Sequence, residues 1–292
     1  MQPTHSATLD RILAAIPPRL LYHYTSPEGL MGIVKDKEAW ASNLRYVSDA
    51  REIDQAVDRA KDAIQHLLTT RVWTDDEKEL LGEMKRAGSA TKLVYAFSLS
   101  EVGDLLSQWR AYCPPSGGYA IGFPSTQLRR TAEKQEFFLC RCVYEDALVY
   151  QIVSEFIEAF VEQYRVRRAA GEVLGQLIQN IAWQFDQHLA LFGAVIKHNS
   201  FQEEREWRLF CRVWEHPQLD FRATRKGILP FFRFRLADDE HPNLARSGDD
   251  MLTVVVGPTG NLGDAQIAIQ LMLMKYLPGA GHSSTATPYR TW

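Results

Sequence analysis

Two long stretches with helical periodicity, at about residues 49–88 and 147–197, interrupt a series of short segments with strand character. In the second stretch, apolar residues recur at helical spacing, for example at Val153, Ile157 and Val161. The strand-like segments cover 20–25, 38–42, 92–100, 119–123, 136–144, 206–214, 228–236 and 252–256. Because strands and helices do not alternate regularly, a doubly wound parallel sheet is not expected. The order predicts one α+β domain over residues 1–292, with a mixed or antiparallel sheet and two helical insertions.

Shorter helices are expected around this sheet, at about 8–16, 27–35, 104–112 and 263–277. Ser26 and Pro27 open the second of them, because a capping hydroxyl and a proline at the first helical position both favour a helix N-terminus. The first helix ends at Pro17. Residues 278–288 are rich in glycine, serine and threonine, which predicts a loop.

The composition is that of an ordinary folded protein, with 46% hydrophobic and 24% charged residues, which excludes wholesale disorder. A net charge of −3 gives the chain no overall attraction to nucleic acid or to anionic lipid. Asp10 and Arg11 interrupt the first apolar stretch, so it does not have the pattern of a signal peptide. No apolar run has the length of a membrane span. We therefore expect a cytoplasmic protein that has no membrane partner.

The four cysteines do not have the spacing of a zinc site. Cys140 and Cys142 lie two apart in a strand-like segment, whereas zinc ligands usually occur as C-x₂₋₄-C pairs with a second pair of ligands. We expect small buried side chains in a reducing compartment, and no metal. The sequence also lacks a Walker loop and the GxGxxG, GxSxG and HExxH motifs, which argues against several common enzyme classes.

Several segments in order along the chain resemble a known family. They are LYHYTS, SDAREI, FSLS, QWRAY, GYAIGF, KHNSFQEEREWRL, VVVGP and the late PYR, and they span about residues 20–290. This set is similar to the bacterial domain-of-unknown-function 2971 family. The family usually has Asn-Asp-Pro where Ser48, Asp49 and Ala50 stand here. A toxin or defence role would suit such a bacterial family, but the family name implies no activity.

A second, weaker resemblance implies chemistry. A histidine on the first strand, a serine-bearing strand that leads into an aromatic helix, and a late strand with glutamate are similar to the arrangement of the ADP-ribosyltransferase superfamily. The resemblance implies that NAD is the substrate and that its ADP-ribose passes to a protein or nucleic-acid acceptor. The NAD-binding residues implied are His23, Tyr24, Ser98, Trp109, Tyr112 and Arg208. The implied catalytic residues are Glu206 and Glu204.

These residue types suit cleavage of the bond between nicotinamide and ribose. Loss of nicotinamide leaves an oxocarbenium-like sugar, which a neighbouring carboxylate stabilises. In the superfamily the histidine holds a ribose hydroxyl, an aromatic ring stacks on nicotinamide, and the glutamate bonds the nicotinamide-ribose hydroxyl. A basic residue can bind the diphosphate, best as a bidentate arginine.

Each of these residues also has a structural interpretation. His23 could be a core histidine bonded to a backbone carbonyl, and Trp109 and Tyr112 have ordinary core spacing. Glu204 and Glu206 would face the same side of one strand, where a surface ladder of ion pairs with Arg208 or Lys197 would suit them. The cluster of Arg222, Arg225 and Lys226 reads as a solvated surface.

The function therefore has alternatives. One is a non-catalytic module that binds a nucleotide or a protein, and another is an NAD glycohydrolase that uses water as the acceptor. The oligomeric state stays open.

Overall fold

The structure is a computed structural model that describes residues 5–46, 51–86, 94–114, 117–212, 219–224, 227–238, 240, 244–247 and 250–287. Its α-helices are α1 (Ala7–Leu13), α2 (Pro27–Asp36), α3 (Arg51–Thr70), α4 (Asp75–Met84), α5 (Leu106–Tyr112), α6 (Ser125–Lys134), α7 (Asp146–Ala169), α8 (Leu174–Gly193) and α9 (Leu262–Tyr276). Its strands are β1 (Leu20–Thr25), β2 (Glu38–Asn43), β3 (Val94–Ser100), β4 (Tyr119–Pro124), β5 (Phe138–Arg141), β6 (Glu206–Arg212), β7 (Leu219–Thr224), β8 (Gly227–Arg235), β9 (Arg246–Ser247), β10 (Asp250–Met251), β11 (Thr253–Val256) and β12 (Gly281–Ser284).

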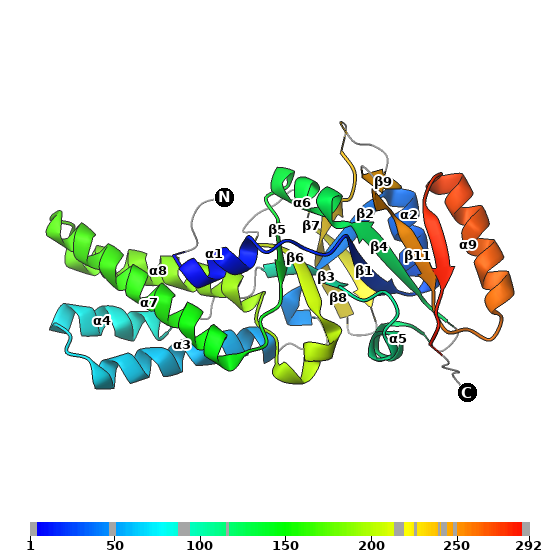
Figure 1. The fold of residues 1–292 in the computed structure, drawn as a ribbon. Coiled ribbons are helices and arrows are strands. Elements are labelled where there is room, and N and C mark those ends of the chain that lie inside the picture. Colours follow the sequence, from blue (N-terminus) through cyan, green and yellow to red (C-terminus); the bar gives the residue numbers. More distant parts are fainter. Residues whose placement is uncertain are drawn as a thin grey trace.

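In the described part of the chain, ten strands form one sheet (Figure 1). The strand order is β12-β11-β4-β1-β3-β2-β8-β7, and β6 joins β5 to β3 beside this path. β11 and β12 are parallel, whereas the other paired strands of the sheet are antiparallel. The expected α+β class with a mixed sheet is therefore confirmed.

The sheet divides at β3. One edge of β3 pairs with β6 along its whole length, from Val94 opposite Arg212 to Ser100 opposite Glu206. The other edge is shared, because β2 pairs with Tyr95 and Ala96 while β1 pairs only with Ser100. Among the described strands, none pairs with residues 97–99 on this second edge. This opening between β1 and β2 positions the candidate site.

Two apolar cores cover the faces of the sheet. On one face, α2, α6 and α9 pack through residues such as Leu30, Leu128 and Leu273. On the other, α1, α3, α4, α7 and α8 form a helical lobe whose core continues onto the sheet through Cys140 and Phe210. The lobe is elongated and extends away from one side of the sheet (Figure 1).

Local sequence signals explain several elements. Ser26 precedes α2, and its hydroxyl accepts a hydrogen bond from the Gly29 amide at 3.2 Å, as an N-cap should. Pro27 occupies the first turn, where it sacrifices no helical hydrogen bond. β1 occupies the predicted residues 20–25, and α9 lies within one residue of its predicted bounds.

Some elements differ from expectation. β12 forms within residues 278–288, where a loop is predicted, because its backbone pairs with β11 although its side chains carry no strand pattern. α6 was not predicted, since its only buried aliphatic side chains are Leu128 and Ala132. Residues 48–50, where the chain departs from the family pattern, lie outside the described residues.

The described helices include none with the length and hydropathy of a membrane span. The four cysteines, which all lie in the described residues, form no disulfide, and three of them, Cys140, Cys142 and Cys211, are buried. Within the described residues, no group of three or more His, Cys, Asp and Glu side chains is arranged to hold a metal ion.

Candidate functional site

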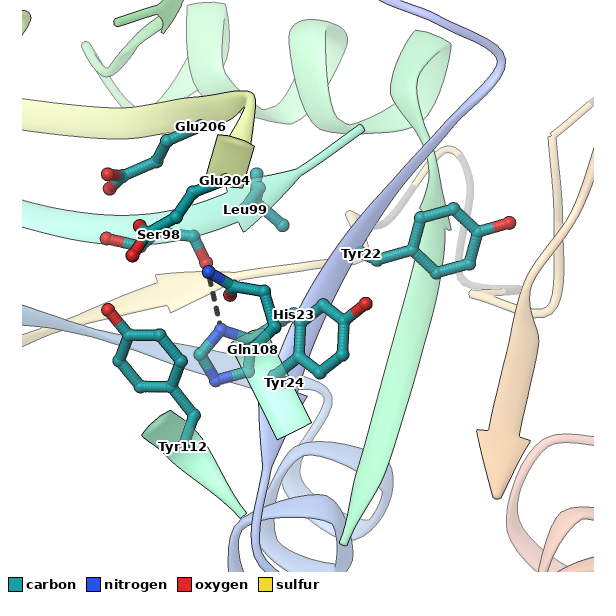
Figure 2. A pocket seen from close by; sticks show the side chains of 9 residues that line it. All are labelled: Tyr22, His23, Tyr24, Ser98, Leu99, Gln108, Tyr112, Glu204 and Glu206. Carbon is teal, nitrogen blue, oxygen red and sulfur yellow. Dashed lines mark hydrogen bonds between the residues drawn. The ribbon is translucent and has the colours of Figure 1, made fainter. Parts of the chain in front are cut away.

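Two adjoining cavities lie where the sheet divides. The smaller has a volume of about 50 Å³ and is lined by Tyr22, His23, Tyr24, Ser98, Leu99, Gln108, Tyr112, Glu204 and Glu206 (Figure 2). The larger has a volume of about 370 Å³ and is lined by His23, Trp40, Ser42, Tyr46, Ala96, Phe97, Ser98, Tyr112, Lys197, Phe201, Glu206, Arg208, Arg222 and Leu229. We call the first the small pocket and the second the large cleft. Because both are lined by His23, Ser98, Tyr112 and Glu206, they adjoin, and we describe them together as one site.

His23 occupies the gap between β1 and β2. Its Nδ1–H donates to the Ser98 carbonyl over 2.9 Å, in the place where a strand partner would otherwise bond (Figure 2). The ring packs on Phe97, with a centroid distance of 4.1 Å. Burial lowers the pKa of His23 to about 4, although the Ser98 bond opposes this shift. The imidazole is therefore neutral near pH 7, and its unprotonated Nε2 can accept a hydrogen bond.

The His23 Nε2 atom is available to a ligand. Among the described residues it has no hydrogen-bond partner, and it is not one of the buried atoms that lack one. The expected bond from a core histidine to a backbone carbonyl is present at Nδ1. It does not account for Nε2, because His23 lines both cavities.

Glu206 begins β6 and belongs to a buried ionic cluster. Its Oε1 accepts from Arg208 Nε at 2.7 Å, and its Oε2 lies 2.5 Å from Lys197 Nζ. Burial alone would raise the pKa of Glu206, but the charges of Arg208 and Lys197 outweigh it and hold the pKa at about 2. All three residues are at most 6% exposed. The expected ion-pair partners are therefore present, but the pairs are buried rather than arranged as a surface ladder.

The alternation of residues predicts that Glu204 lies on the same strand as Glu206. In the structure, Glu204 lies before that strand begins. It ends a 3₁₀ helix at Asn199–Glu204, and Arg205 follows with a left-handed φ of 44°. The turn reverses the chain before β6 starts, and Lys197 Nζ reaches Glu204 Oε2 at 2.7 Å as well as Glu206. Lys197 is the cation that keeps the two carboxylates together, since like charges would otherwise repel.

The two aromatic residues of α5 have different surroundings. Trp109 is 2% exposed, packs edge-on against Tyr24, and donates its indole N–H to Asp104 at 2.7 Å. It does not line either cavity. Tyr112 is 44% exposed and lines both. Tyr112 and Gln108, one turn apart on α5, face His23 across the small pocket (Figure 2).

The remaining residues implied by the resemblance are also placed. The Tyr24 hydroxyl accepts from the Leu105 amide and donates to the Val102 carbonyl, so it supports the start of α5, while the side chain lines the small pocket. Ser98 is exposed to the site. Arg208 is bonded to both Glu206 oxygens and to the Ala194 carbonyl, so its donors face protein groups.

Arg222 is a site residue that the sequence did not reveal. The sequence places it in a basic cluster on a solvated surface, but its side chain turns over Trp40 and lines the large cleft. The alternation of side chains along β7 could have placed Arg222 on the face of the large cleft, but the sequence did not predict β7 as a strand. Arg225 and Lys226 lie outside the described residues.

The site combines groups that bind polar organic ligands. It has a neutral histidine acceptor, two carboxylates, an exposed tyrosine and a partly buried arginine, in a cleft that the Phe201 and Trp40 rings also line. These protein groups can bind the hydroxyl groups, a planar ring and an anionic group of a ligand.

Residues 108–209 match the model of a family described as a protein of unknown function, DUF2971. The matched segment includes Gln108, Tyr112, Glu204, Glu206 and Arg208, whereas His23 and Ser98 lie before it. A search of curated proteins and a search of solved structures each gave no significant match. The comparisons therefore support the first resemblance in part and do not extend to the ADP-ribosyltransferase superfamily.

Proposed function

We propose that this protein binds NAD at the division of the sheet, cleaves its nicotinamide–ribose bond and transfers ADP-ribose to an acceptor, with an ADP-ribosyltransferase-like arrangement of the site. The observation that carries the proposal is that His23 from β1, Tyr112 from α5 and Glu206 from β6 each line both the small pocket and the large cleft. These are the residue types that the reaction needs, and the fold brings them together from three distant segments.

Each residue has a chemical role in the proposal. The neutral His23 accepts a hydrogen bond from a ribose hydroxyl at Nε2, while Nδ1–H stays bonded to the Ser98 carbonyl. The Tyr112 ring stacks on nicotinamide, whose positive charge favours an aromatic face. As nicotinamide leaves with the bonding electron pair, the Glu206 carboxylate stabilises the positive charge that develops on the ribose.

The pairing of Glu206 with two cations favours a second candidate function, in which the site binds a nucleotide without catalysis. Because Arg208 and Lys197 offset its charge, Glu206 stabilises a ligand cation less than an unpaired carboxylate would. A nucleotide-binding module without catalysis would need only the shape and hydrogen bonds of the same site. The two candidates agree on binding and differ only in bond cleavage.

The test is to measure NAD binding by calorimetry and nicotinamide release by chromatography, using the purified chain of residues 1–292. Release is followed with water alone and with added protein or nucleic acid, so that a glycohydrolase is also detected. Glu206→Gln should reduce release by about a hundredfold or more, because the carboxylate acts as charge develops, while NAD affinity changes little. Glu204→Gln is the matched control and should have a smaller effect.

Both variants are assayed at a temperature where circular dichroism shows them folded. NAD binding without any nicotinamide release would support the non-catalytic module. Absence of NAD binding at millimolar concentration would overturn the proposal and favour a module that binds another nucleotide or a protein.

A further inference from the structure

Arg222, on the edge strand β7, carries a charge that no carboxylate of the described residues balances. One of its donors, Nη2, bonds to the Ser42 hydroxyl at 2.9 Å. Its Nε is buried and has no hydrogen-bond partner in the described residues. The described carboxylates include none paired with Arg222, and burial lowers the pKa of its guanidinium. Burial of a charged arginine lowers the stability of the fold unless hydrogen-bond acceptors or a negative charge pair with it.

The other cations of the large cleft are already engaged. Lys197 contacts two carboxylates, and Arg208 grips Glu206 through two nitrogens. With Glu204 and Glu206 they make a group of two positive and two negative charges, which sum to zero. Among the described residues that line the cleft, Arg222 is therefore the cation that can attract an anion.

The position of Arg222 is suited to a ligand that also reaches His23. Both residues line the large cleft, and the charge of Arg222 contributes to the lowered pKa of His23. The guanidinium lies 5.6 Å from the centroid of the Trp40 ring, which holds it in the cleft. A planar guanidinium with free donors matches the oxygens of a phosphate group.

We propose that Arg222, rather than Arg208, is the phosphate-binding residue of the cleft and that it binds the diphosphate of NAD. The identity of the ligand rests on the proposed function, whereas the anion site itself does not. His23 then holds the ribose and Arg222 the diphosphate of the same molecule.

The test uses two probes that contain the diphosphate without nicotinamide, namely ADP-ribose and inorganic pyrophosphate. Arg222→Gln should weaken binding of both by about tenfold or more, because charge-assisted hydrogen bonds to phosphate are lost. Arg222→Lys keeps the charge without the planar fork and should lose less. Arg233→Gln is the matched control, because Arg233 lies on the adjacent strand and near the same Trp40 ring but pairs with Asp220 and Glu38.

Melting curves identify any variant that does not fold, in which case Arg222→Lys decides the outcome. A parent protein that binds neither probe, or an Arg222→Gln variant that binds both as well as the parent, overturns the assignment even if nicotinamide is released. Equal losses in the Arg222 and Arg233 variants also overturn it, because a general change in charge would explain them. Selective loss in Arg222→Gln supports the anion site even if the parent never releases nicotinamide.

Discussion

The two sides of the cleft differ in whether their charged side chains are paired with one another. On the β6 side, Glu204, Glu206, Lys197 and Arg208 pair with one another. On the β2 and β7 side, Arg222 has a hydroxyl and aromatic rings around it but no described carboxylate partner, and the nearby His23 is kept neutral. The charges on the paired side are balanced by described residues, whereas those on the unpaired side are the ones to which the proposed function assigns a ligand.

This difference predicts that substitutions on the two sides lower stability by different amounts. A buried ion pair contributes little beyond what an apolar pair would, yet removing one partner is costly because the other is left unpaired. Substitution of an unpaired group in a cleft should lower the free energy of unfolding less, and its main effect should be on ligand affinity. The predictions below test this contrast.

The largest effect is expected from Glu206→Gln on stability. Removal of its charge leaves Arg208 and Lys197 without their shared carboxylate, which should lower the free energy of unfolding by about 3–5 kcal/mol. Glu204→Gln should cost roughly 1–2 kcal/mol, because Lys197 keeps its bond to Glu206. Urea denaturation of the parent and both variants measures these values. A loss from Glu206→Gln no greater than that from Glu204→Gln would show that the paired side is not a structural unit.

His23→Gln should affect binding and pH dependence. Loss of the Nε2 acceptor is expected to weaken NAD binding by roughly fivefold to tenfold, as for one hydrogen bond. The folded pKa of His23, about 4, lies below the ordinary value of 6.5. The unfolded chain therefore binds the proton more readily, and the parent should lose stability as the pH falls from 6.5 toward 4.

His23→Gln should lack this component of the pH dependence. Denaturation midpoints measured between pH 7 and pH 4 compare the two proteins. If the variant and the parent lose stability in parallel over that range, His23 is not the neutral residue described above.

The smallest effect is expected from Tyr112→Ala. Since its ring is 44% exposed, its loss should change the melting temperature little but weaken NAD binding by about threefold to tenfold through lost stacking. Trp109→Ala is the contrasting variant on the same helix. It should lower the free energy of unfolding by about 3–5 kcal/mol, as for a buried tryptophan. A Tyr112 variant with unchanged affinity and lower stability would reverse the roles assigned to these two residues.

Much of the secondary structure was predictable because its signals are local. The periodicity around Ile157, the cap at Ser26 and the strand at 20–25 all depend on neighbours within a few residues. β12 and α6 were missed for the same reason, since their own residues carry little pattern. Pairing with β11 and packing beneath the sheet decide those segments.

The sequence by itself also indicated His23, Tyr112, Glu204 and Glu206 as candidates for chemistry. It did not distinguish Tyr112 from Trp109, because both have the spacing of a core helix and only the packing of α5 on β1 buries one of them. It also could not show that Lys197 joins the two carboxylates or that Arg222 turns into the cleft. Those facts depend on how β6, β7 and β2 align in the sheet, and strand register is set by contacts between segments far apart in the chain.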